Sequence, residues 1–349
     1  MPSSQRWKHR PPGSNWGEFG MDDQRGRLNL LTPARVRRAV SEVQEGLTFC
    51  LSLPLDYPGG NGLNPRRHPS QPAPTMRNGK PNMAYALSCD EPGLTDVVCD
   101  DVVMLTLQYS TQWDALSHFG QEFDADGDGE AEIVFYNGYR GGEHIIGAAH
   151  VCEAAPGRPA RSMGAYALGI ENMATSCVQG RGVMVDFKAH FGRERVLVGY
   201  DTLMRILEKD RVTVEEGDLL CVRTGFDEAL LSMRRQPDAE LLKSSFGILD
   251  GRDDRLLQWI TDSGIVALIC DNNAVEASPS RPATTERYSN LPLHAHCLFR
   301  IGVHLGEFWF FQELADWLRT AGRSRFLLTA PPLRLPHAVG SPATPVATV

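Results

Sequence analysis

A short run, residues 108–118, collects two amides, a carboxylate and an imidazole directly after an apolar segment. The preceding residues 101–107 are rich in β-branched and apolar types, which predicts a buried strand. The polar side chains that follow cannot be buried unless each of them finds a partner. Such a group at a strand end indicates either a site or a hydrogen-bonded turn, and Asp114 and His118 alone do not decide between the two.

Two further places combine ionisable groups with apolar surroundings. Residues 271–276 follow the predicted strand 265–270 directly, at the kind of strand end where α/β proteins bind ligands, although a polar turn is the alternative. Glu307 lies among Leu, Phe and Trp, and its carboxylate would be costly to bury unpaired. We therefore expect Glu307 to have a partner, either a basic side chain or a metal.

Other charged stretches are interpreted as structural. Residues 124–132 have the alternating carboxylates and the glycine of a calcium loop, but Phe135 stands where an EF-hand requires Glu, and no helical pattern flanks the stretch. We interpret it as an acidic turn, with cation binding as the alternative. The neighbouring pairs Asp186 with His190 and Glu143 with His144 are expected to have surface or capping roles.

Composition excludes several classes of protein. The 349 residues carry a net charge of −8, and the basic residues are scattered, so no nucleic-acid footprint is visible. No stretch approaches the ~18 apolar residues of a membrane span, and no apolar run follows the N-terminus, which makes the cytoplasm the expected compartment. The eight cysteines are widely spread without a CxxC pair, which indicates reduced thiols rather than disulfides or a zinc site.

The elements that would position these groups alternate along the chain. Strands are predicted at 182–186, 218–223, 265–270 and 326–328, and helices at 202–209, 255–262 and 311–320, with a further helix that begins at a Thr32 cap and Pro33. This pattern predicts an α/β fold in one domain, residues 16–349. Residues 1–15 are expected to form a loose arm, residues 54–81 a long loop or lid, and residues 340–345 a tail that is ordered only by docking.

Several motifs in the same order resemble the cyclase family of kynurenine formamidase-like metal-dependent hydrolases, which includes isatin hydrolases. The motifs span nearly the whole chain: residues 15–23, 28–33, 108–118, 136–138, 181–183, 222–225, 271–276, 293–294, 302–307, 330–332 and 340–342. The resemblance implies an α/β fold of the swivelling β/β/α type, with a mixed, barrel-like sheet surrounded by helices. It also implies a homodimer or a homotetramer.

The family pattern HxGTHxDxxxH is altered in this chain. By the resemblance, Gln108, Gln112 and Asp114 occupy the positions of metal ligands, His118 occupies the position of the catalytic histidine, and His294 and Glu307 complete the metal site. Two imidazole ligands have thus become amides, whose oxygens bind zinc or manganese more weakly. The resemblance implies a divalent metal, manganese or zinc, while the two glutamines leave its retention open.

Three functions follow as hypotheses. The first is a hydrolase of an amide, lactam or ester carbonyl in a small cyclic or aromatic substrate, with His118 as general acid and base. The second is a metal-independent cyclase or dehydratase that uses His118 and Glu307, with His294 as a further catalytic residue, and the third is a binding protein that keeps the same pocket. Four residues are predicted to contact the substrate: Trp16, Phe19, Trp113 and Asn273.

Overall fold

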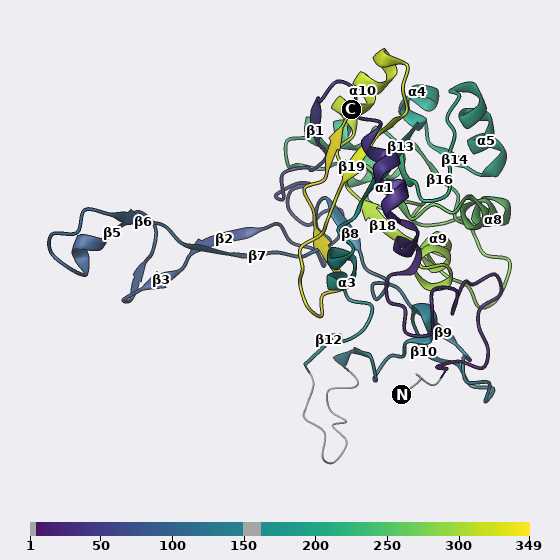
Figure 1. Cartoon of the computed structure of the whole chain (residues 1–349), viewed down its shortest axis with the longest axis horizontal. Coiled ribbons are helices and arrows are strands. Elements are labelled where there is room, and N and C mark those ends of the chain that lie inside the picture. Colours follow the sequence, from purple (N-terminus) through teal and green to yellow (C-terminus); the bar gives the residue numbers. More distant parts are fainter. Residues whose placement is uncertain (1–4, 149–161) are drawn as a thin grey trace.

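A curled sheet of nine strands forms the centre of the body in the computed structural model, which describes residues 5–148 and 162–349 (Figure 1). Across the sheet the strands are β1 (Thr48–Cys50), β21 (Val346–Thr348), β19 (Arg325–Thr329), β13 (Gln179–Asp186), β15 (Leu219–Arg223), β17 (Ala267–Cys270), β18 (His304–Glu307), β8 (Gln112–Asp114) and β20 (Gly340–Pro342). The central strands β13, β15, β17 and β18 are parallel to one another, whereas β19 is antiparallel to β13 and β8 is antiparallel to β18. The sheet is therefore mixed, as the resemblance implied.

Both faces of this sheet are covered by apolar side chains. Along β15, Leu220 and Val222 join the core that also contains residues of helices α5 and α8, while Leu219 and Cys221 join a second core with residues of α3 and α10. Because successive side chains of a strand point to opposite faces, a continuous apolar run suits a strand buried on both.

The described helices include the four that were predicted, at 33–40, 200–209, 254–263 and 312–321, and further ones that were not predicted. They are η1 (Gly26–Leu30), α1 (Pro33–Val40), η2 (Leu87–Cys89), η3 (Tyr136–Gly138), α3 (Ile170–Thr175), α4 (Phe187–Phe191), α5 (Tyr200–Lys209), α6 (Phe226–Ser232), α7 (Ala239–Lys243), α8 (Asp254–Ser263), α9 (Pro292–His294), the π-helical η4 (Ala295–Arg300) and α10 (Gln312–Ala321). Thr32 caps α1 through a hydrogen bond from the Arg35 N–H, as predicted. Within the described residues, no helix is both long and apolar enough to cross a membrane.

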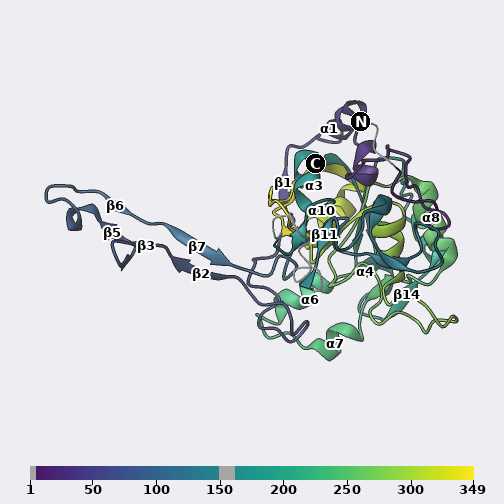
Figure 2. The ribbon, with the colours of Figure 1, turned by 90° about the horizontal axis from the view of Figure 1, so that it is seen from below.

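A β-hairpin arm, residues 71–104, projects far from the body (Figures 1 and 2). Its strands are β2 (Gln71–Pro74), β3 (Met76–Arg77), β4 (Lys80–Pro81), β5 (Tyr85–Ala86), β6 (Val97–Val98) and β7 (Asp101–Met104). The prediction of a buried strand at 101–107 is wrong, because β7 pairs only with β2 and all four of its residues are exposed. The prediction of a structureless loop at 54–81 is also wrong where β2, β3 and β4 form.

Both ends of the chain are packed against the body where they are described. Trp7 is buried with its ring centroid 5.6 Å from that of Trp16, so the prediction of a loose arm is wrong for residues 5–15, and residues 1–4 lie outside the described residues. At the other end, β20 pairs with β8, which orders the tail by docking as expected.

The remaining strands form small two-stranded sheets. They are β9 (Gln121–Phe123) with β10 (Glu132–Val134), β11 (Ile145–Ile146) with β12 (Gly164–Ala165), and β14 (Val196–Val198) with β16 (Gly247–Leu249). The acidic stretch connects β9 to β10. Both carboxylate oxygens of Asp124 accept backbone N–H groups there, and Arg140 pairs with Asp126 and Glu132, so local partners account for much of its charge.

Candidate active site

Strand register brings three of the predicted site residues together. In the antiparallel pairing of β8 with β18, Gln112 lies opposite Glu307 and Asp114 lies opposite Leu305. Side chains alternate along a strand, so Gln112 and Asp114 share one face with Glu307 while Trp113 points to the other. Gln112 Nε2 lies 3.1 Å from Glu307 Oε2 and 3.5 Å from Asp114 Oδ1.

His294 completes this arrangement from the end of α9, where the chain passes into the π-helical segment. Its Nε2 lies 3.3 Å from Glu307 Oε1, and its Nδ1 lies 2.8 Å from Glu276 Oε1. Burial by itself lowers the pKa of His294, but the hydrogen bonds to Glu276 and Glu307 outweigh it and raise that pKa to about 10. The imidazole is thus held between two carboxylates.

The carboxyl groups of this site differ in their surroundings. Asp114 is fully buried, and desolvation raises the pKa of its carboxyl group. Burial acts in the same direction on Glu307, yet its contact with His294 lowers the pKa of Glu307 overall. Desolvation thus determines the shift of Asp114, whereas the nearby His294 determines that of Glu307.

Two buried acceptor atoms in the site have no hydrogen-bond partner among the described residues. These are Asp114 Oδ2 and Gln112 Oε1. Asp114, His294 and Glu307 also bring one ligand atom each to within 4.8 Å of one another. A cation would satisfy acceptors that are otherwise costly to bury, so the donor set of two carboxylates, an imidazole and an amide oxygen fits a divalent metal.

The other two predicted residues of the 108–118 run lie beside this group. His118 Nε2 is 3.8 Å from Asp114 Oδ1, and the ring lines the adjacent cavity. Gln108 accepts a hydrogen bond from Arg67 through its backbone carbonyl (2.7 Å), whereas its own Nε2 is buried without a partner among the described residues. The structure therefore joins His118 to the site, and it shows no hydrogen bond from the Gln108 side chain to the site carboxylates.

A cavity of about 350 Å³ opens over the site. His118, His294 and Glu307 line its inner part, and Asn273 and Phe308 lie beside them. This volume suits a small molecule. Three basic side chains also line the cavity: Arg66, Arg67 and Lys243.

Three of the four predicted substrate contacts lie elsewhere. Trp16 and Trp113 are both buried in the core, and each donates its indole N–H to a backbone carbonyl, that of Phe299 for Trp16 and that of Ala330 for Trp113. Phe19 is partly buried in the segment beside Trp16 and does not line the cavity. Asn273 alone of the four lies at the cavity.

Sequence reasoning missed Glu276 and Arg67 as site residues. Glu276 accepts the backbone N–H groups of Leu293 and His294 as well as contacting the His294 ring. Arg67 lies close enough to Asp114 and Glu307 for its charge to lower the pKa of both carboxyl groups. The only signal in the sequence was the position of Glu276 in a polar run after a strand.

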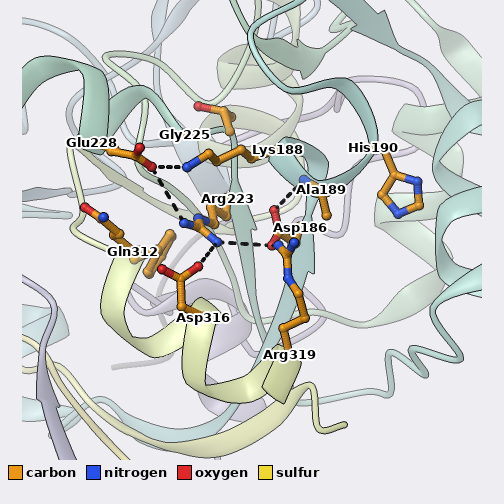
Figure 3. A network of polar contacts seen from close by, with 12 residues as sticks. Asp186, Lys188, Ala189, His190, Arg223, Gly225, Glu228, Gln312, Asp316 and Arg319 are labelled. Carbon is orange, nitrogen blue, oxygen red and sulfur yellow. Dashed lines mark hydrogen bonds and ion pairs between the residues drawn. The ribbon is translucent and has the colours of Figure 1, made fainter. Parts of the chain in front are cut away.

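Asp186, expected to have a capping role, caps α4 by accepting the Ala189 N–H. It also belongs to a separate polar network at the end of β15, which we call the Arg223 cluster (Figure 3). That cluster consists of Arg223, Asp186, Lys188, Glu228, Asp316 and Arg319. His190 pairs with Asp210 rather than with Asp186.

Asp271, at the start of the other predicted strand-end group, forms a structural corner. Its two oxygens accept the N–H groups of Thr224 and Gly225, each at 2.7 Å. Desolvation and the neighbouring Asp227 raise the pKa of its carboxyl group well above the usual value. Asp271 thus belongs to a polar turn, which was the alternative for residues 271–276. Glu276, at the other end of this stretch, reaches the site.

Comparison with known proteins shows the family to which this chain is similar. The profile of the family described as "Putative cyclase" matches residues 51–277. A crystal structure described as that of a novel cyclase is 31% identical, covers 98% of this chain and 100% of its own, and superposes with a TM-score of 0.72. No curated protein matches the chain.

More distant structures share the fold. Isatin hydrolase A from Labrenzia aggregata, bound to benzyl benzoate, is 13% identical with a TM-score of 0.53, and the match covers 88% of this chain and 94% of that one. Isatin hydrolase A from Ralstonia solanacearum is 12% identical with a TM-score of 0.53, over 86% and 91% of the two chains.

Proposed function

The chain belongs to the cyclase family, and we propose that it is a hydrolase that acts on an amide, lactam or ester carbonyl of a small cyclic or aromatic substrate. The observation that carries this proposal is the buried, unpaired acceptor Asp114 Oδ2, on a carboxylate whose other oxygen lies 3.8 Å from His118, a residue that lines a cavity of substrate size. Isatin hydrolases, which share the fold, support hydrolysis as the type of reaction.

Asp114, His294 and Glu307 would hold a divalent manganese or zinc ion, with Gln112 as a weaker oxygen ligand. Such an ion, when bound, lowers the pKa of a water molecule and polarises a carbonyl group. Glu276 would fix the His294 ring through Nδ1, which leaves Nε2 directed toward Glu307 and the centre of the site.

His118 is the residue placed to move protons during the reaction. Its ring reaches the cavity, and its Nε2 faces Asp114 at 3.8 Å, a contact that a bound substrate would tighten. In this role His118 takes a proton from the attacking water and returns it to the leaving nitrogen or oxygen. Imidazole suits both steps because its ordinary pKa lies near neutrality.

The basic side chains at the cavity favour a substrate with an anionic group. Arg66, Arg67 and Lys243 line it, and Arg67 lies within electrostatic reach of both site carboxylates. A carboxylate on the substrate would gain a charge-assisted hydrogen bond there.

A second candidate function is supported by the orientation of Gln112. Its Nε2 donates toward Glu307 and Asp114, so the amide holds the two carboxylates together as N–H donor. In this arrangement His118 and Glu307 would act as an acid/base pair without a metal, and the enzyme would catalyse cyclisation or dehydration of an activated substrate.

The experiment that separates these functions combines metal analysis with turnover. Protein purified without chelator is assayed on paired aryl esters, amides and lactams, with and without a carboxylate group, before and after EDTA treatment and after addition of manganese or zinc. We expect hydrolysis that EDTA abolishes and that one of the two ions restores. Hydrolysis that survives EDTA in protein free of metal contradicts the metal-dependent mechanism and supports the His118 and Glu307 pair. Ligand binding without turnover under all conditions contradicts both enzymatic proposals.

A further inference from the structure

The exposed arm carries apolar side chains that its own strands do not cover. Val102, Val103 and Met104 of β7 are 55%, 50% and 68% exposed, and Val97 and Met76 farther out are 61% and 64% exposed. An isolated two-stranded hairpin is at best marginally stable in water, and three or more strands are needed to form a stable sheet. The arm thus has exposed apolar residues and too few strands to be stable alone, as expected of an element that packs against another one.

The two outer edges of the arm differ in their ability to accept another strand. The Thr75 N–H donates to the Asp100 carbonyl (2.9 Å), so Thr75 and Asp100 form a hydrogen-bonded pair of the antiparallel ladder. Hydrogen-bonded and non-hydrogen-bonded pairs alternate along such a ladder. The backbone N–H and C=O of Val102 therefore face β2, and those of Val103 face away from it. On β2 the residues that face outward are Pro72 and Pro74, opposite Val103 and Asp101.

Because proline has no N–H, the outer edge of β2 cannot form a continuous ladder with another strand. The outer edge of β7 contains no proline, and the residues whose backbone groups face outward are Asp101 and the β-branched Val103. Within the described residues β7 pairs with β2 alone. The arm is therefore blocked on one side and open on the other, which is an arrangement that directs pairing to β7.

We propose that the outer edge of β7 pairs with the β7 of a second copy of this chain, antiparallel and about a two-fold axis near Val103. The product is a four-stranded sheet in the order β2, β7, β7 of the second copy, β2 of the second copy. Its proline-containing edges end the sheet on both sides, so the assembly closes at two chains along this edge.

A second copy fits this edge for reasons of symmetry and charge. Two identical antiparallel strands are related by a two-fold axis, so the open edge of β7 on one chain can pair with the open edge of β7 on another. An axis near Val103 keeps the two Asp101 carboxylates apart and brings valine side chains together, whereas an axis at Asp101 would place like charges opposite each other. This proposal does not depend on the proposed function.

The first test measures the mass of the full-length protein in solution by light scattering after size exclusion. We expect wild-type mass to be an even multiple of the 38.5 kDa chain, and Val103→Pro to halve it or to raise the dissociation constant by roughly tenfold or more through lost edge hydrogen bonds. The Val103 N–H faces away from β2, so proline leaves the hairpin's own ladder intact.

A matched pair of charge variants separates edge pairing from a general effect of surface charge. Val103→Lys and Val40→Lys replace two valines that are both 50% exposed, one on β7 and the other on α1. We expect only Val103→Lys to weaken assembly. A monomeric wild type at tens of micromolar, or an unchanged mass in both Val103 variants, overturns the proposal.

Amide hydrogen exchange of the wild type tests the same contact without a substitution. The outward N–H of Val103 should be protected to a degree similar to the inward N–H of Val102. Rapid exchange at Val103 beside a protected Val102 overturns edge pairing, even if the protein forms a dimer by another surface.

Discussion

The Arg223 cluster, at the end of β15, and the group around Glu307, at the end of β18, are two groups of charged residues that differ in how their charges are matched. In the Arg223 cluster, three carboxylates lie among three basic side chains, and Arg223 Nη1 is 2.9 Å from Asp316 and 3.3 Å from Asp186 (Figure 3). In the group formed by Gln112, Asp114, His294 and Glu307, the carboxylates outnumber the bases, and Asp114 Oδ2 has no partner among the described residues.

This difference separates structural polar groups from functional ones. In the Arg223 cluster the charges balance, and the one buried atom without a partner among the described residues, Arg223 Nε, is a donor that cannot bind a cation. An unmatched acceptor in a buried position is costly unless something binds to it, and stability alone does not explain why a chain retains it. The substitutions below are chosen to show opposite effects in the two groups.

The largest expected effect is on catalysis at His118. His118→Gln should lower kcat/KM by roughly 10²- to 10⁴-fold, because the group that transfers protons is lost, while the melting temperature stays close to that of the wild type. His190→Gln, which replaces a histidine paired with Asp210 outside the site, is the matched control and should leave kcat/KM unchanged. An equal effect of the two substitutions would remove His118 from the mechanism.

A loss of stability is expected from Arg223. Arg223→Met removes the buried guanidinium that Asp186 and Asp316 share, but Asp186 keeps Arg319 and Asp316 is exposed, so the free energy of unfolding should fall by about 1–2 kcal/mol. Chemical denaturation measures this loss, and kcat/KM of the folded variant should change little. A variant of wild-type stability that has lost activity would mean that the Arg223 cluster belongs to the functional site.

Glu276 contacts the ring of the site residue His294, and its substitution should have an effect of intermediate size on metal affinity or on kcat/KM. Glu276→Gln weakens the contact that orients the His294 ring, which should lower metal affinity or kcat/KM by about 10- to 100-fold. Titration with manganese measures the affinity directly. Glu216→Gln, which removes a surface partner of Arg35, is the control. An unchanged affinity and rate would show that backbone contacts alone position His294.

The smallest expected effect concerns His304, a buried histidine that contrasts with His294. Burial lowers the pKa of His304 to about 3, whereas an unfolded histidine titrates near 6.5. Below pH 6.5 the unfolded state therefore binds a proton that the folded state does not, and stability falls as the pH falls. Between pH 7 and 5.5 the wild type should lose about 1 kcal/mol more than His304→Leu, as measured by denaturation at both pH values. Equal losses would contradict this.

Much of the fold follows from local patterns. Runs such as residues 218–223 are apolar enough to be strands buried on both faces, and Thr32 with Pro33 marks a helix start, because capping and side-chain periodicity act within a few residues. Both features are present in the structure. The family also follows from the sequence, because its motifs appear in order along the chain.

The site itself was predictable only in part. Alternation along a strand puts Gln112 and Asp114 on one face, and the apolar surroundings of Glu307 require a partner for it. The amino-acid sequence by itself thus determined the family and the main elements, and it pointed to Gln112, Asp114 and Glu307 but not to Glu276 or Arg67.

Only the tertiary structure decided which partners these residues meet and which strands are buried. Gln112 and Glu307 are 195 positions apart, and their contact depends on the register of β8 with β18. The same dependence explains β7, whose apolar residues suit a buried strand but lie on an exposed arm. Local pattern determines backbone conformation, whereas burial depends on elements that are distant in sequence or that belong to another chain.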